Sequence, residues 1–208
     1  MAVFNKPALF GGGEFEAFPG GEDPAAVLRA AHESARQLLI RAREPDDPEV
    51  VDRLVTYTDE HGLDALAELW ARSSPHSLPG ALWRIYLVRV LIRQDPDGVA
   101  LLFQRGTEVL STIDPVVAGA PLPAGPAEIT ELADTILRGA FEGDFAIALE
   151  RAAAFCRVTA AGGLSIADDQ EVANPERATE LTTRAQRLII TAEELMSCAR
   201  LARAEMLD

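Results

Sequence analysis

Three arginines on one apolar stretch are the residues in this sequence best placed to do chemistry. The stretch runs from Ser77 to Gln94, and its charged residues are Arg84, Arg89 and Arg93. From spacings of five and four residues we expect the three side chains to share one narrow face of a helix. Such a row could bind a phosphate or carboxylate ligand, which makes these arginines the candidate ligand-binding residues. It could equally pair with acidic residues of neighbouring helices, and we favour this interpretation because the chain has 33 acidic residues.

Motifs for catalysis or metal binding are missing from the sequence. The three histidines lack the Glu-x-x-His and His-x-x-x-His spacings of common metal sites. Cys156 and Cys198 fall inside apolar helical patterns, which is typical of buried thiols in a reducing compartment. Lys6 is the only lysine, so no glycine loop is followed by Lys-Ser or Lys-Thr. We therefore expect no catalytic residue, no metal and no cofactor.

The net charge of −14 argues against broad binding to nucleic acids or to anionic membranes. The first residues lack the basic region and the cleavage site of a signal peptide. No apolar run reaches the length of a membrane-spanning helix. We expect a cytoplasmic protein whose partners are proteins, with no nucleic acid and no membrane among them.

The stretch that carries the arginines is predicted to be the central helix of the fold. Ser77 can cap its first turn, and Pro79 is tolerated there because the first amides have no partner inside the helix. The segment 81–92 is apolar nearly all round, which is typical of a helix surrounded by others. A buried strand is the alternative, but the length and the arginine spacing favour a helix. Leu87 and Val88 should then be core residues.

Asp-Pro and Asn-Pro pairs mark five further helix starts. Asp or Asn as N-cap, with Pro in the first helical position, is a strong start signal. The five pairs begin at Asp23, Asp47, Asp95, Asp114 and Asn174. With the apolar periodicity, they predict helices over 23–43, 48–61, 63–72, 77–94, 96–104, 129–142, 144–161 and 176–206.

Glycines are predicted to end several of these helices. Gly106 lies beyond the helix over 96–104, and Gly162 with Gly163 ends the helix that precedes a polar loop over 164–174. Thr191 with Glu194 has the spacing of a capping box, so a kink or a second helix is predicted there.

Two segments are predicted to lie outside regular helices. Residues 115–126 are dense in Pro, Ala and Gly, which favours a stiff, structureless linker between two helical layers. Residues 1–22 are predicted to be an extended arm, rich in Gly and Phe. The candidate interface residues of this arm are Phe4, Phe10, Phe15 and Phe18. Their rings must dock on their own chain or on a second copy, and we expect the second copy.

These patterns together predict an all-α protein. We expect an irregular multi-helix array or bundle of seven to eight helices, with an extended arm over 1–22 and a single helical domain over 23–208. A boundary between layers is possible at 115–126. The expected function is that of a non-enzymatic interaction or regulatory protein acting as a homodimer. The alternative is a binding protein or enzyme for a small anionic molecule, with a pocket near Arg84, Arg89 and Arg93.

Overall fold

The computed structural model describes residues 23–43 and 69–208. Every regular element in these two ranges is a helix, which confirms the predicted all-α class. The helices are α2 (Pro24–Ala42), α5 (Leu78–Gln94), α6 (Pro96–Val109), α7 (Asp114–Ala118), α8 (Pro126–Glu142), α9 (Phe145–Gln170) and α10 (Pro175–Arg203). The predicted arm, the helix predicted over 48–61 and most of that over 63–72 lie outside the described residues.

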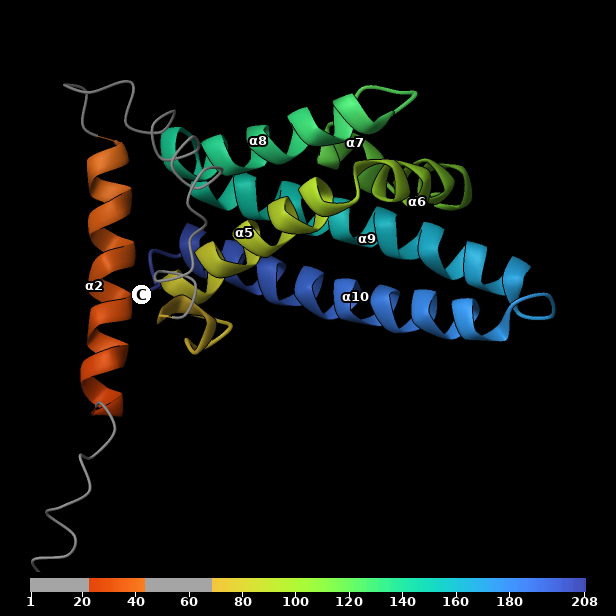
Figure 1. Cartoon of the computed structure of the whole chain (residues 1–208). Coiled ribbons are helices and arrows are strands. Elements are labelled where there is room, and N and C mark those ends of the chain that lie inside the picture. The colour runs from red at the N-terminus through yellow and green to blue at the C-terminus, as the bar shows by residue number, and fades with distance from the viewer. Residues whose placement is uncertain (1–22, 44–68) are drawn as a thin grey trace, which may run out of the picture.

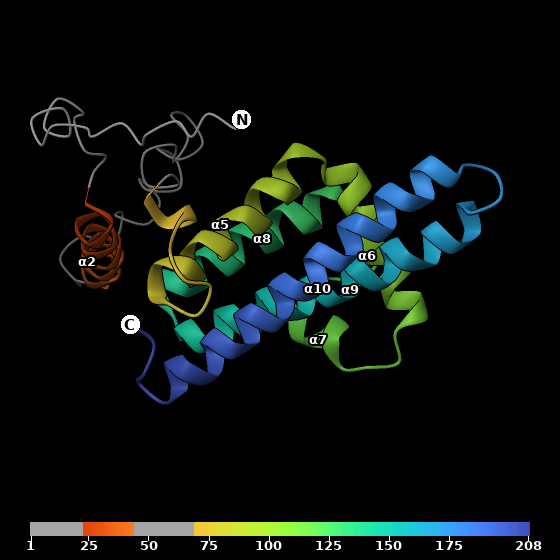
Figure 2. The same ribbon diagram turned by 90° about the horizontal axis from the view of Figure 1, so that it is seen from below.

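The central helix of the described array is α9, and not α5 as predicted. Helices α5, α6, α7, α8 and α10 all pack against α9, and α10 runs beside it along most of its length (Figures 1 and 2). The segment 152–156 of α9 is buried at every position. Within it, the ring of Phe155 stacks on that of Phe103 from α6, with 5.6 Å between the ring centroids. The core is therefore built around a helix whose buried residues are mostly small, which lets its neighbours approach closely.

Helix α5 lies at the side of the array, with one buried face and one exposed face. Ile85, Val88 and Ile92 point into the core and are at most 3% exposed. Leu87 is 42% exposed, and Trp83 is half-buried. The prediction that Leu87 belongs to the core is therefore wrong. The sequence pattern is apolar on every side of α5, but the described helices cover only one side.

Glycines lie inside α6 and α9 where they were predicted to end helices. Gly106 lies within α6, and α9 continues through Gly162 to Gln170. A Cβ on Gly162 would lie 1.8 Å from the carbonyl oxygen of Leu102, and a Cβ on Gly106 would lie 1.9 Å from that of Val158. These glycines therefore allow the two backbones to approach closely. The predicted polar loop over 164–174 shrinks to a short turn after α9.

Helix α8 follows its prediction closely, whereas the linker before it does not. The buried residues of α8 form the predicted stripe: Ile129, Leu132, Ala133, Ile136, Leu137, Ala140 and Phe141. The linker begins with the short helix α7, and both Ala118 and Ala124 are buried. Asp114 is the first residue of α7 and not its N-cap as predicted, and its carboxylate accepts a hydrogen bond from Arg157 Nε at 2.8 Å. The segment is thus packed against α9 instead of being structureless.

Side-chain caps start the other predicted helices. The capping residues, whose side chains each accept a hydrogen bond from an amide of the first turn, are Asp23, Ser77, Asp95, Asp144 and Asn174. Helix α10 continues through Thr191, whose hydroxyl donates to the carbonyl oxygen of Arg187. The predicted second start at Thr191 is therefore wrong.

Helix α2 stands across one end of the array (Figures 1 and 2). At this end, Asp208 connects the start of α5 to α2. Its carbonyl oxygen accepts a hydrogen bond from the amide of Leu78 at 2.8 Å, and its side chain pairs with Arg36 of α2. Within the described ranges, no helix combines the length and the apolar character that crossing a membrane requires.

Candidate functional site

All three arginines of α5 contact carboxylates from other helices. Arg89 Nε donates to Asp134 Oδ1 at 3.1 Å, and Arg93 Nη2 donates to both oxygens of Asp134 at 3.1 and 3.0 Å. Arg84 Nε donates to Glu194 Oε2 at 2.5 Å. The prediction that Arg89 contacts a carboxylate is confirmed. One acidic residue of α8 therefore joins two of the three arginines, and one of α10 holds the third.

The burial of the arginines and their carboxylate partners indicates the role of these ion pairs. The side chain of Arg89 is only 4% exposed, while that of Asp134 is 27% exposed. A buried guanidinium without a counter-charge would be strongly unfavourable, so Asp134 compensates the charge of Arg89. Arg84 also donates to the carbonyl oxygen of Gly80 at 3.0 Å. Arg84 thus points to α10, whereas Arg89 and Arg93 point to α8, so the prediction that the three side chains share one narrow face is wrong. The contacts tie α5 to α8 and α10, which is a structural role.

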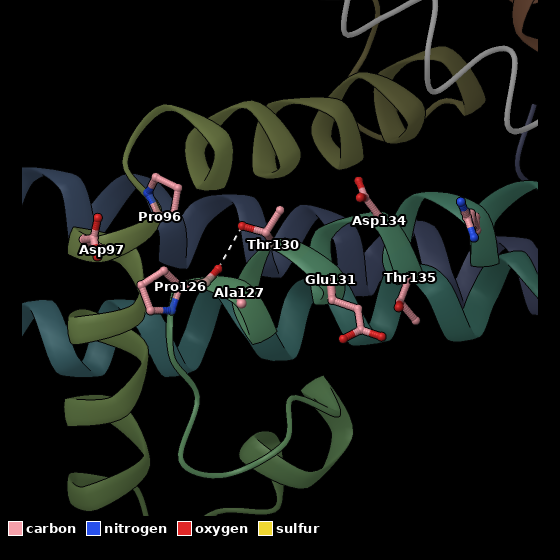
Figure 3. Close-up of a pocket in the computed structure, with 9 residues that line it drawn as sticks. Pro96, Asp97, Pro126, Ala127, Thr130, Glu131, Asp134 and Thr135 are labelled. Atoms are coloured by element: carbon pink, nitrogen blue, oxygen red, sulfur yellow. Dashed lines mark hydrogen bonds between the residues drawn. The ribbon is translucent and has the colours of Figure 1, made fainter.

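A surface groove of about 700 Å³ lies beside Asp134, between the start of α6 and α8 (Figure 3). Asp134 lies on the side of α8 that faces α5, and Glu131 lies on the other side (Figure 3). The residues that line the groove are Pro96, Asp97, Pro126, Ala127, Thr130, Glu131, Asp134, Thr135 and Arg138. Three carboxylates and one guanidinium among these residues give it a negative charge overall. None of the three arginines of α5 lines this groove.

Metal and thiol chemistry find little support in the described residues. Within 23–43 and 69–208, no three residues of the types His, Cys, Asp and Glu come together in a way that could hold a metal ion. Burial raises the pKa of the Cys156 thiol to about 12, and burial also raises that of Cys198 to about 11. Both thiols are therefore protonated near neutral pH, and neither is a ready nucleophile.

The second feature of the surface is an apolar groove of about 370 Å³ between α5 and α10. Just before it on α5, the rings of Trp83 and Tyr86 lie 5.6 Å apart. We call the groove and these two rings the α5–α10 face. Its residues are Trp83, Tyr86, Leu87, Val88, Val90, Leu91, Gln94, Leu188 and Thr191, none of which is charged.

Sequence reasoning missed this face. The apolar character of α5 on every side was its signal, but that signal was interpreted as complete burial. The four phenylalanines predicted as interface residues, Phe4, Phe10, Phe15 and Phe18, lie outside the described residues. Comparison with known proteins found no matching family model, no similar curated protein and no similar solved structure.

Proposed function

We propose that this protein is a non-enzymatic interaction or regulatory protein that acts as a homodimer, with the α5–α10 face as its interface. The observation that carries the proposal is the lack of charge on this face. The chain has a net charge of −14, yet the groove between α5 and α10 is lined by Leu, Val, Gln and Thr alone. An exposed apolar surface within an acidic one is typical of a protein–protein interface.

The residues of the face suit this role. Leu87 is 42% exposed, and the rings of Trp83 and Tyr86 are half-buried. Aromatic side chains contribute strongly to interface energetics, since a few buried rings can account for much of the binding free energy. A two-fold axis would place α5 of each copy against the same face of the other. Burial of such apolar area stabilises a complex by about 25 cal/mol per Å² before the entropic cost of association.

Charge repulsion between two copies gives the proposal a further consequence. Two chains of charge −14 repel each other at low ionic strength, and salt screens this repulsion. An apolar interface is not weakened by the same screening. We therefore expect dimerisation to strengthen as the salt concentration rises.

Molar mass in solution, measured by light scattering, tests the proposal. We expect the parent chain at micromolar concentration to show twice its chain mass of 22.4 kDa. Leu87→Glu should give the monomer mass, because it places a charge in the interface. Leu101→Glu is the matched control: Leu101 is 59% exposed on α6 and does not line the groove. A monomeric parent, or a Leu87→Glu variant that stays dimeric, rejects the proposed interface.

The alternative function is binding of a small anionic molecule near Arg84, Arg89 and Arg93. The groove beside Asp134 has a volume typical of ligand sites. Its support is weaker, because three acidic residues and one arginine give the lining a net negative charge, and the arginines of α5 already contact carboxylates. Calorimetric titration with inorganic phosphate tests it: binding heat that disappears in Arg138→Ala would favour this alternative over the homodimer.

The buried, free thiols of Cys156 and Cys198 support our proposal of a reducing, cytoplasmic location.

A further inference from the structure

A separate hollow of about 470 Å³ lies at the start of α2. The residues that line it are Pro24, Val27, Leu28 and Ala31 of α2 and Leu69, Arg72 and Ser73 from the segment before α5. Five of these seven side chains are apolar, and Leu28, at 48% exposure, is the most exposed large apolar residue among them. The hollow shares no residue with the α5–α10 face or with the groove beside Asp134.

Two polar groups in this hollow have no partner among the described residues. Ser73 is only 9% exposed, and its hydroxyl has no hydrogen-bond partner within the part of the chain that the structure describes. A buried hydroxyl without a partner is unfavourable, so this one indicates a missing occupant. Arg72 is exposed and makes no ion pair with any described residue. The apolar walls suit an apolar ring, the Ser73 hydroxyl needs an acceptor such as a backbone carbonyl, and Arg72 suits a carboxylate. We therefore expect an occupant that carries all three groups.

We infer that the hollow binds Phe18 of the chain's own N-terminal arm. The arm leads directly into Asp23 and Pro24, and Pro24 itself lines the hollow. Phe18 precedes Asp23 by five residues, which span at most about 17 Å when extended. The wall from Pro24 to Ala31 is about 10 Å long at the helical rise of about 1.5 Å per residue. The tether is therefore long enough to reach any part of the hollow.

The sequence between Phe18 and α2 favours a return of the chain onto α2. Pro19, Gly20 and Gly21 lie in that interval, and such residues permit the tight reversal that the path requires. The ring of Phe18 would fill the apolar walls, and the backbone beside it offers a carbonyl oxygen to the Ser73 hydroxyl. Glu16 lies two residues before Phe18 and can pair with Arg72.

The short tether favours the same chain over a second copy. A ligand held by a few residues has an effective concentration of about millimolar, well above that of a second chain at micromolar concentration. This inference departs from the prediction that the arm joins two copies. It is also independent of the proposed homodimer, whose interface lies on other residues.

Disulfide trapping in the full chain tests the inference. Ala17→Cys with Leu28→Cys keeps Phe18 and places one thiol beside it and the other at the hollow. Ala17→Cys with Ala30→Cys is the matched control, since Ala30 is exposed and lies two residues along α2, on the opposite side of the helix. The native thiols are buried, with pKa values raised to about 12 and about 11, so they do not compete. We expect an intramolecular disulfide to form at least about tenfold faster in the first pair.

Two further variants show whether Phe18 is the anchor. Phe18→Ala, added to the first pair, should remove its rate advantage, whereas Phe4→Ala should leave it unchanged. Equal rates for the two cysteine pairs would show that the arm does not dock in the hollow. A covalent dimer on a non-reducing gel would assign the hollow to the arm of a second copy. Either result overturns the inference.

Discussion

Gly162 of α9 and Gly106 of α6 meet at the closest approach between these two helices. A Cβ on Gly162 would lie 2.7 Å from the amide nitrogen of Gly106 and 1.8 Å from the carbonyl oxygen of Leu102. Both neighbours are backbone atoms, which cannot move away as a side chain can. The contact is therefore possible only because each helix carries a glycine at the crossing.

Gly162→Ala should destabilise the protein by about 1–3 kcal/mol or more, because the added methyl group forces the two helices apart. The free energy of unfolding in urea measures this effect. Gly163→Ala is the matched control, since its Cβ would meet Ala185 Cβ at an ordinary 3.7 Å. Alanine is the better helix former by about 1 kcal/mol, so this control should be neutral or stabilising. Equal losses in the two variants would contradict the described packing of α6 on α9.

The exposed and buried faces of α5 should respond differently to truncation. Ile85→Ala is expected to cost about 2–5 kcal/mol, because Ile85 is 1% exposed and the change leaves a cavity. Leu87→Ala should cost less than about 1 kcal/mol when the chain is monomeric, since Leu87 is 42% exposed. Thermal unfolding at low protein concentration compares the two. If Leu87→Ala lost more stability than Ile85→Ala, this would indicate that α5 is buried on all sides.

Removal of Asp134 should take one carboxylate away from the buried guanidinium of Arg89. Asp134→Ala is therefore expected to destabilise the fold by about 1–3 kcal/mol, while Glu131→Ala, on the outer side of α8, should change stability by less than about 0.5 kcal/mol. The double variant Arg89→Met/Asp134→Ala should lose less than the sum of the single variants, because it also removes the buried charge that Asp134 compensates. Strict additivity in denaturant unfolding would show that the pair is not coupled.

The ion pair between Asp114 and Arg157 should make stability depend on pH. The hydrogen bond from Arg157 holds the pKa of Asp114 below its ordinary value of 3.8. A lowered pKa in the folded state stabilises the protein above pH 3.8, and this contribution disappears as the pH falls through the lower folded value. Asp114→Asn should therefore be less stable than the parent at neutral pH, and the difference should shrink in acid.

Urea unfolding at about pH 7 and about pH 3 measures this difference. Arg157→Met should show the same loss with the same pH dependence, because it breaks the same ion pair. If Asp114→Asn lost the same unfolding free energy at both pH values, the charge of Asp114 would not be the cause of the loss.

The sequence predicted those helices whose apolar residues lie on a single stripe. Every residue of the α8 stripe from Ile129 to Phe141 is buried as expected, because one helix face packs on the core and the other meets water. The capping residues were predicted equally well at Ser77 and Asp95, since a cap is a local hydrogen bond. Features that depend only on neighbours in the sequence were thus accessible without the structure.

The errors arose where a distant partner decides the outcome. Gly106 and Gly162 have the same local signal as helix-ending glycines, and only the opposite helix shows why they lie in helix interiors. At the candidate site, a carboxylate beside Arg89 was expected from burial and charge alone. Its identity as Asp134 was not, because many acidic residues fit that requirement equally well.

The central position of α9 has a consequence for the order in which the protein can fold during its synthesis. The ribosome releases α5 and α6 before α9, which begins only at Phe145. Until then Phe103 has no Phe155 to stack on, and the inner side of α5 has only part of its final cover. Until α9 is synthesised, α5 and α6 therefore expose their apolar sides. In this state chains are prone to aggregate or to be bound by chaperones. Native packing of α5 and α6 on α9 is thus delayed until the segment from Phe145 to Gln170 has been translated.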